Sequence, residues 1–408
     1  MGILDTPHQV EMERAALAAL ATPEVAAAVR EIEQLYAADA TGATPDGATT
    51  AAAAARAITH AAVKYALAEA DTGMRVQWTA NAAHAWHGLE VPSSGYGIDN
   101  PDNVHRNTGV DPLAEFRILG RARDGAPQQQ TFILYAELPG TGEMGREGAE
   151  IIDVVVHVPT PGERFEITVG PEPDGGPLHL CTRGRARFLI VRDALGDWGR
   201  DLPTELTIEP RPEKEQVLDH TKAAARAVEL APQIARYWLE YNNLYLWSRE
   251  PNRLLTPRLR AFGAAASTTF SLAPETCLLV TVDPTGAGYV GCQLTDPWGV
   301  ALEYVGRTGS LNQAQARRNA DGTITYVVGA VDPGIHNWLD TGGLHNGMLT
   351  LRWQSFAETP SDLDGAVREC RLVPAADVAA LLAEQAVGSE EREQQLEQRS
   401  LDYGRRLS

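Results

Sequence analysis

Two loops of the sequence concentrate side chains that could transfer protons. They cover residues 86–112 and 331–347, and each places Asp, Asn, His and Trp between Gly and Pro residues. This composition fixes the backbone while it presents hydrogen-bonding groups. A carboxylate beside a second carboxylate or a histidine can become an acid or a base through its surroundings. The candidate catalytic residues are therefore Asp99, Asp102, His105, His336 and Asp340.

Arginines, asparagines and tryptophans in these loops and elsewhere in the C-terminal half could hold a substrate. Arginine binds carboxylates and other oxygen-rich groups, and a tryptophan ring offers a flat stacking surface. This set suits a hydroxyl-rich or carboxylate-bearing small molecule, on condition that the segments around Asn103 and Trp338 face each other across a shared hollow. The candidate binding residues are Trp86, Asn103, Arg106, Trp298, Arg307, Asn312, Asn337, Trp338 and Arg352.

Three functions fit these residues. The leading hypothesis is a hydrolase or lyase that uses acid–base chemistry on a polar, hydroxylated substrate, either glycan-like or a small metabolite. The alternative is a non-catalytic ligand-binding or assembly module, in which Asp and Asn cap turns and Trp covers a sheet edge. A third option is a metal-dependent enzyme that uses His84, His87 and His105. We expect no metal, because the sequence shows no fourth ligand or supporting residue near the first two histidines.

The charge balance argues against several classes of partner. The 408 residues include 35 Lys and Arg against 54 Asp and Glu, for a net charge of −19. Nucleic acids and anionic membranes need a basic binding face, so we expect neither as a partner. No apolar run reaches the roughly 18 residues of a membrane span, and the N-terminal segment lacks the pattern of a signal peptide. The 4 cysteines are scattered, and we take them as reduced. The sequence thus predicts a cytoplasmic protein.

One motif matches a dinucleotide-binding fingerprint but lacks its structural context. Gly140, Gly142 and Gly145 fit the pattern G-x-G-x-x-G, yet the residues after them alternate as a strand. The fingerprint must open a helix, whose N-terminus faces the pyrophosphate. We therefore predict a hairpin loop at this point and no cofactor. The expected partner is a small-molecule or glycan-like ligand, and homo-oligomerisation stays open.

Helical and strand patterns alternate along the chain and must position the two loops. Thr-Pro pairs at Thr6, Thr22 and Thr44 each predict the start of a helix. Period-two alternation with Gly- and Pro-rich turns predicts antiparallel strands. Pro232 predicts a break between two connector helices, and the charged C-terminal tail predicts a helix that packs loosely or docks on a partner. The expected segments are an N-terminal helical region (1–75), a β domain (76–211), a helical connector (212–266), a second β domain (267–373) and a C-terminal helix with its tail (374–408).

This pattern defines the expected fold class. It is mainly β with helical additions (α+β), and it comprises two β-sandwich or jelly-roll-like domains joined by helices.

Several motifs resemble a bacterial two-domain family of unknown function. The run DNPDNVHRNTGVDP with the strand FRILGRA resembles domain of unknown function 1254, and residues 269–373 resemble domain of unknown function 1214. The second likeness includes Ala273-Pro274-Glu275, Ser310-Leu311-Asn312 and Asn337-Trp338-Leu339-Asp340-Thr341. The resemblance implies two β domains joined by helices and no particular reaction. This chain has Gly291 and Cys292 where relatives carry bulkier residues, which would reshape a pocket there.

Overall fold

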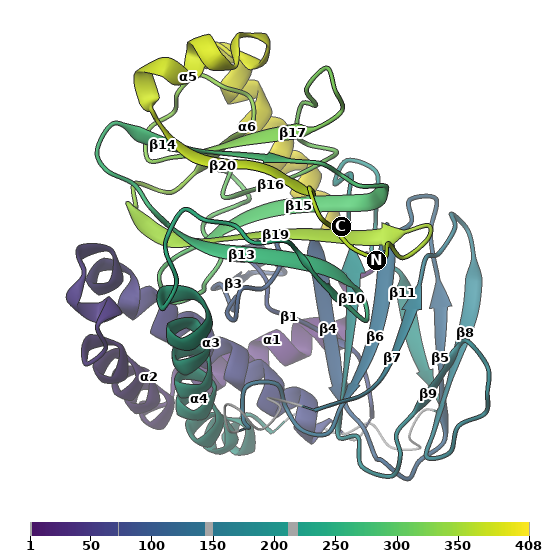
Figure 1. Ribbon diagram of the computed structural model, residues 1–408. Helices are drawn as coiled ribbons and strands as arrows, with labels where there is room; N and C mark the ends of the chain where they lie inside the picture. Colours follow the sequence, from purple (N-terminus) through teal and green to yellow (C-terminus); the bar gives the residue numbers. More distant parts are fainter. Residues whose placement is uncertain (1, 72, 143–149, 211–218, 408) are drawn as a thin grey trace.

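The computed structural model describes residues 2–71, 73–142, 150–210 and 219–407. Two bodies of β-sheet lie against each other, and long helices cover one side of their junction (Figure 1). The fold is α+β, mainly β with helical additions, as the periodicity predicts. The expected hairpin at Gly140–Gly145 lies partly outside the described residues. No helix in the described ranges has the length and apolar character that a membrane crossing requires.

The three Thr-Pro pairs begin three helices, as predicted. The hydroxyls of Thr6, Thr22 and Thr44 each accept a hydrogen bond from the backbone N–H three residues later. Proline follows each threonine, where its missing N–H costs nothing. The helices are α1 (Pro7–Leu20), α2 (Pro23–Ala37) and α3 (Pro45–Ala70).

The first β body is a sandwich of two sheets. Its five-stranded sheet has the order β1-β4-β10-β6-β7, and its four-stranded sheet has the order β11-β5-β8-β9. Alternate residues from both sheets form one apolar core, which includes Phe132, Ile167 and Val191. The strands are β1 (Gln77–Thr79), β4 (Asn103–Gly109), β5 (Phe116–Arg121), β6 (Gln129–Tyr135), β7 (Ile151–His157), β8 (Arg164–Gly170), β9 (His179–Cys181), β10 (Phe188–Ala194) and β11 (Glu205–Glu209), with a separate hairpin of β2 (His84–Trp86) and β3 (Leu89–Val91).

The second β body repeats this arrangement. Sheets of order β12-β13-β19-β15-β16 and β18-β17-β14-β20 enclose a core with Phe270, Val280 and Trp353. Strand structure begins at Arg258, earlier than the sequence pattern indicates, because β12 adds an edge to the sheet. The strands are β12 (Arg258–Arg260), β13 (Gly263–Ser271), β14 (Thr276–Val282), β15 (Ala287–Thr295), β16 (Ser310–Asn312), β17 (Ile324–Gly329), β18 (Trp338–Asp340), β19 (Asn346–Phe356) and β20 (Val367–Pro374).

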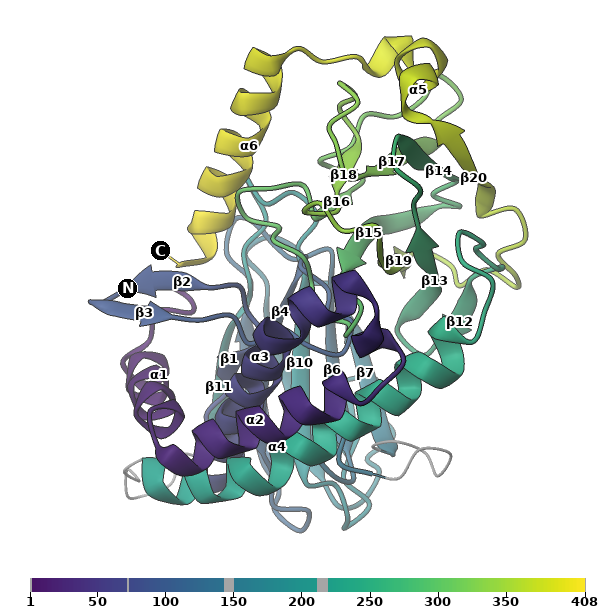
Figure 2. The ribbon, with the colours of Figure 1, turned by 90° about the vertical axis from the view of Figure 1, so that its left-hand side faces the viewer.

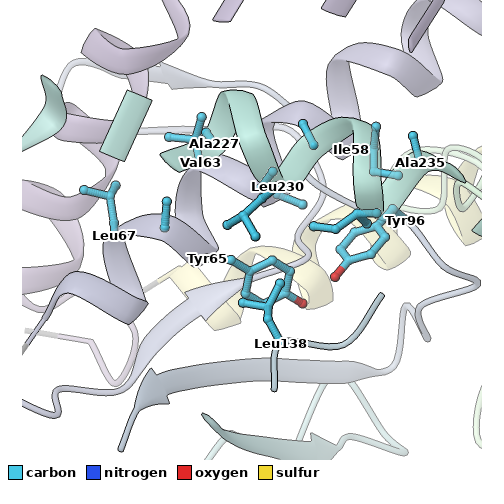
Figure 3. Packing of buried hydrophobic residues seen from close by; sticks show 14 of the residues in the cluster. Ile58, Val63, Tyr65, Leu67, Tyr96, Leu138, Ala227, Leu230 and Ala235 are labelled. Carbon is cyan, nitrogen blue, oxygen red and sulfur yellow. The ribbon is translucent and has the colours of Figure 1, made fainter. Parts of the chain in front are cut away.

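The connector helix is continuous, so the predicted break at Pro232 is wrong. Helix α4 (His220–Asn242) runs through Pro232, which is itself buried, and ends in a short π-helical segment, Asn243–Trp247. Ala227, Leu230 and Ile234 on its apolar face are almost fully buried in the core shared with α2 and α3 (Figure 3). A proline inside a helix costs about 3 kcal/mol, and packing of this face offsets that cost.

The C-terminal helices pack on the chain itself rather than loosely. Helix α5 (Ala375–Leu381) follows β20, and α6 (Ser389–Gly404) descends along one side of the molecule to the hairpin β2–β3 (Figure 2). Arg399 and Arg406, both buried, stack on the Trp198 ring with guanidinium carbons 4.3 Å and 4.4 Å from its centroid. The charged tail hides these contacts from sequence analysis, because its buried arginines stand among glutamates and glutamines that are mostly exposed.

Two polar sheet faces meet where the β bodies join. In β4 and β10, His105 and Arg192 are paired neighbours, and they lie on the face opposite the apolar core. In β19, Arg352 alternates with the core residues Leu351 and Trp353, so it lies on the outer face of its sheet. Each sheet therefore keeps its apolar side for its own core and turns polar side chains towards the other body.

The Asp102 carboxylate connects the two bodies. It accepts hydrogen bonds from the Tyr289 hydroxyl (2.7 Å), the Asn312 amide (2.8 Å) and the Trp198 indole (2.8 Å). Tyr289 and Asn312 belong to the second body, and Asp102 is 1% exposed. Gly291 is required here, since a Cβ atom on it would lie 2.1 Å from the Tyr289 hydroxyl. The small residue thus admits the tyrosine to the carboxylate rather than enlarging a pocket.

We expect Asp102→Asn to lower the free energy of unfolding by about 3 kcal/mol, because the amide replaces an acceptor oxygen with an N–H2 group that faces donors and leaves buried polar groups unpaired. Urea denaturation of the purified variant measures this free energy of unfolding. Asp124→Asn, at an exposed carboxylate, is the matched control and should unfold like the unaltered protein. Equal stability of the Asp102 and Asp124 variants would contradict the role of Asp102 in the junction.

Candidate functional site

Asp99 lies in the loop before β4, and the second β body holds this loop in place. The backbone oxygen of Asp99 accepts a hydrogen bond from the Gln293 amide (2.8 Å), and Arg352 donates to the Ile98 backbone oxygen and to Gln293. Ile98 has φ +58°, a left-handed conformation that a β-branched residue rarely adopts. Such a backbone persists only where its surroundings impose it. The junction therefore fixes the position of Asp99.

Gly97 gives this loop its close approach to α4. Its φ is +65°, and an added Cβ atom would lie 2.7 Å from the Trp238 ring. Only glycine meets both conditions, since it has no side chain to clash and tolerates positive φ.

Burial changes the ionisation of Asp99 and His105. Desolvation raises the pKa of Asp99 from 3.8 to about 7, although Arg352 and backbone N–H groups oppose that shift. Desolvation lowers the pKa of His105 well below its usual value, and the positive charges of Arg192 and Arg352 lower it further. Near neutral pH, Asp99 thus exchanges its proton readily while His105 is a neutral imidazole.

Three tyrosines form a wall beside Asp99. The rings of Tyr65, on α3, and Tyr96 meet edge to face with centroids 5.9 Å apart, and both belong to the core that α3 shares with α4 (Figure 3). Burial raises the pKa of Tyr65 to about 12, and the nearby Asp99 and Tyr135 add to this rise. Burial also raises the pKa of Tyr96, so the hydroxyls of Tyr65 and Tyr96 stay protonated at neutral pH and can act as hydrogen-bond donors.

Arg192 is a member of this site that sequence analysis misses. Its guanidinium carbon lies 5.2 Å from the centre of the Phe262 ring, and its Nε is buried without a hydrogen-bond partner. A signal for it exists in β10, where Arg192 stands at an alternate position between Ile190 and Ala194. The residue was hidden because its role depends on β10 pairing with β4, a contact that the sequence does not display. We call Asp99, His105, Arg192, Arg352, Tyr65, Tyr96 and Tyr135 the junction cluster.

Other candidates from the first loop have structural contacts. Asp102 and Asn312 bind each other as described above. Arg106 forms a buried ion pair with Asp193 (2.6 Å) inside the first sandwich, and the Trp86 indole donates to Glu13 (2.5 Å). Asn103 begins β4, on the same sheet face as His105, and its Oδ1 is buried without a partner.

The second loop lies in different surroundings. Asp340 pairs with Arg307 (2.7 Å), and the Trp338 ring lies under Arg392 of α6 at 5.3 Å. Asn337 accepts a hydrogen bond from the Arg317 backbone N–H and donates to the backbone oxygens of Arg317 and Thr325. These contacts give the buried Asn337 a structural role.

His336 lies apart from the junction cluster. It lines a cavity of about 400 Å³ under α6, and no residue of the first loop lines that cavity.

The hollow expected between Asn103 and Trp338 is not supported by these contacts. The described hydrogen bonds, ion pairs and ring contacts join neither residue to the other. Trp298 is separate as well, because it stacks on Tyr36 with centroids 4.1 Å apart. Of the predicted catalytic and binding residues, the structure brings Asp99, His105 and Arg352 together.

The three histidines of the metal hypothesis do not converge. His84 lies 3.3 Å from Glu13, His87 pairs with Asp5, and His105 belongs to the junction cluster. Within the part of the chain that the structure describes, no group of three or more His, Cys, Asp or Glu residues is arranged to hold a metal ion. The metal hypothesis therefore gains no support from this geometry.

Comparisons with known proteins show the fold. No protein-family model matches the sequence, and no curated protein matches it. Among solved structures, an uncharacterised protein from Burkholderia cenocepacia aligns with a TM-score of 0.68 and 20% identity, over 89% of this chain and 99% of its own. The VPA0106 protein from Vibrio parahaemolyticus aligns at a TM-score of 0.38 and 11% identity over 67% of this chain and 89% of its own, a likeness too weak to carry an argument. The first similarity establishes a shared fold alone.

Asp99→Asn should stabilise the protein at alkaline pH. Because the pKa of Asp99 is higher in the folded protein (about 7) than the ordinary 3.8, its contribution to stability is fully present below about pH 4 and is lost as pH rises through 7. Asp99→Asn does not lose stability in this way. The difference in free energy of unfolding between the variant and the unaltered protein should therefore grow by on the order of 2 kcal/mol from pH 5 to pH 8.

Urea denaturation at both pH values measures the difference, and Asp124→Asn again serves as the control. Asp296, whose pKa burial also raises to about 7, is present in all three proteins and cancels from the comparison. A stability difference between the Asp99 variant and the unaltered protein that does not change with pH would show that Asp99 ionises normally.

Proposed function

We propose that this protein is an enzyme, a lyase or hydrolase that acts on a small polar, hydroxylated substrate at the junction cluster, with Asp99 as the acid–base residue. The observation that supports this most is a carboxyl group with a pKa near 7, fixed near Arg352 by a loop with an unusual backbone conformation. A general acid or base works best when its pKa lies close to the working pH. Such carboxyl groups concentrate at functional sites.

Each member of the cluster has a role in this proposal. Asp99 takes a proton from the substrate or returns one to it. Neutral His105 can donate or accept a hydrogen bond at a substrate oxygen, because its Nδ1 has no partner in the protein. Tyr65 and Tyr96 can donate hydrogen bonds to hydroxyl or carbonyl oxygens, and Arg352 offers positive charge from a position fixed by Gln293.

Asp99 is the one carboxylate that the described contacts place in the junction cluster, which favours lyase chemistry over glycosidase chemistry. Glycosidases use two carboxylates across the scissile bond. Asp102 is the nearest in sequence, but its oxygens are occupied by Tyr289, Asn312 and Trp198. In a β-elimination, one carboxylate can remove the proton next to a carbonyl or carboxyl group and return it to the β-hydroxyl, which leaves as water while the carbon–carbon double bond forms. Hydrogen-bond donors stabilise the negative charge that develops in between.

A non-catalytic ligand-binding module is the second candidate. It is favoured by the structural contacts of Asp102, Arg106, Asn312 and Asn337, which account for those residues without any reaction. The two candidates differ at Asp99, since a binding protein needs no group that exchanges a proton near pH 7.

We place this activity in the cytoplasm. All four cysteines are free thiols, which fits a reducing compartment. Membership of the family with domains of unknown function 1254 and 1214 also stays part of the proposal, on the sequence motifs given above.

The test of the proposal is a screen of hydroxy acids and sugar acids for turnover, followed by kinetics of Asp99→Asn and Asp99→Glu. For a base with a pKa near 7, kcat/KM should rise with pH and level off above about pH 7. Asp99→Asn should reduce kcat at least about 100-fold, and Asp99→Glu should keep part of the activity with a changed pH profile.

Asp124→Asn should leave the kinetics unchanged. Full activity of Asp99→Asn would refute the catalytic role, whereas a ligand that binds without any turnover would favour the binding module.

A further inference from the structure

The domain junction gathers positive charge inside an acidic protein. Arg192 and Arg352 lie close enough for each to act electrostatically on His105, and Arg192 acts on Arg352 as well. The chain as a whole carries a net charge of −19, so this local excess of arginine runs against its composition. Like charges in a poorly solvated region repel each other strongly. An arrangement of this kind calls for a compensating negative group.

Neither arginine forms an ion pair with a carboxylate of the described residues, although Asp99 and Asp102 lie within electrostatic range of Arg352. The Arg192 side chain makes no ion pair or hydrogen bond among the described residues, and its Nε is buried without a partner beside Phe262. Arg352 donates only to neutral acceptors, the Gln293 amide oxygen and the Ile98 backbone oxygen. By contrast, Arg106 on the other face of the same sheet is paired with Asp193 at 2.6 Å. The first sandwich therefore neutralises its own buried arginine, whereas the junction does not.

The carboxylates close to the junction do not supply the missing charge. Asp102 is occupied by three neutral donors. Asp99 forms no ion pair within 4.0 Å of either guanidinium, although it lies within electrostatic range of Arg352. One of its oxygens, Oδ1, is buried without a partner. Arg192, Arg352 and Asp99 nevertheless each keep part of their surface accessible.

From this geometry we infer that Arg192 and Arg352 bind an anionic oxygen group of a small molecule, a carboxylate or a phosphate, next to Asp99. The inference rests on the proposed function for the identity of the site, and it adds the chemical class of the substrate. Guanidinium groups bind such anions through paired N–H donors. The Phe262 ring beside Arg192 supplies an apolar wall for the rest of the ligand.

Binding of the anion should be coupled to proton uptake by Asp99. A negative ligand beside Asp99 disfavours its ionised form, so the carboxyl takes up a proton when the ligand binds above about pH 7. His105 does not contribute at that pH, because nearby arginines and burial keep it neutral. The charged or titratable groups that interact electrostatically with Asp99 are Arg352 on β19, Tyr65 on α3, Tyr96 in its own loop, Tyr304 after β15 and Tyr403 on α6. Arg192 on β10 acts on Arg352, and both arginines act on His105 of β4.

Isothermal titration calorimetry with three probes tests the inference. Lactate carries a carboxylate, inorganic phosphate carries a phosphate, and propane-1,2-diol is the uncharged counterpart of lactate. Titrations at pH 8 in two buffers of different ionisation enthalpy give the number of protons taken up. We expect at least one anion to bind, the diol not to bind, and a net proton uptake that is larger at pH 8 than at pH 5.5.

Variants assign the effect to residues. Arg192→Gln should weaken anion binding about tenfold or more, and Arg192→Lys should restore part of it, because a lysine keeps the charge. Asp99→Asn should abolish the proton uptake and tighten binding at pH 8, since it removes a negative charge from the site. Arg258→Gln, at an exposed arginine of β12, is the control and should bind like the unaltered protein.

The outcomes separate the inference from the proposed function. Binding of lactate alone identifies a carboxylate, and binding of phosphate alone identifies a phosphate. Failure of both anions, equal binding of the diol, or unchanged proton uptake in Asp99→Asn overturns the inference. Anion binding without turnover of any screened substrate refutes the proposed enzyme and leaves the anion site standing.

Discussion

The structure depends on one buried carboxylate that serves two bodies of β-sheet at once. Asp102 belongs to the first body. Its carboxylate accepts hydrogen bonds from Tyr289 and Asn312 of the second body and from Trp198 of the first. A buried carboxylate is costly unless its oxygens are fully satisfied, and here they are. The same tryptophan is held between Arg399 and Arg406 of the C-terminal segment, so this segment joins the interaction as well. Sheets, loop and C-terminal helix are thereby fixed to one another.

Because Asp102 holds the two bodies together, polar side chains on their facing sheet surfaces lie at the junction. In an isolated sandwich the same surfaces would be exposed to water. Each β body uses one sheet face for its own apolar core and presents the other at the junction. His105 Nδ1 and Arg192 Nε are consequently buried without hydrogen-bond partners, and Arg352 donates to neutral acceptors only. Asp99, three residues before Asp102, is carried into the same region and loses much of its tendency to ionise. The two carboxylates of this loop thus have opposite effects on the stability of the fold. Asp102 stabilises the junction, whereas burial of Asp99 lowers stability and makes this carboxyl group more reactive.

Local signals in the sequence predicted much of the fold and little of the site. Thr-Pro pairs and period-two alternation act over a few residues, so the N-terminal helices and the strand-rich segments are confirmed. The break at Pro232 is wrong, because burial of the α4 face outweighs the local cost of proline. For the site, Asp99, His105 and Arg352 could be named as chemical types, but Arg192 could not. Its partners come from β4 and the second body, and strand pairing of that kind is not written in any short stretch of sequence.

The raised pKa of Asp99 is the property on which the functional account rests. The direct measurement is a carboxyl carbon-13 NMR titration of protein labelled at aspartate, with Asp99→Asn used to assign the signal and to separate it from that of Asp296. The account predicts that the Asp99 carboxyl titrates at about pH 7 and that the transition moves upward when a bound anion is present. A transition near pH 4 that no anion shifts would contradict it.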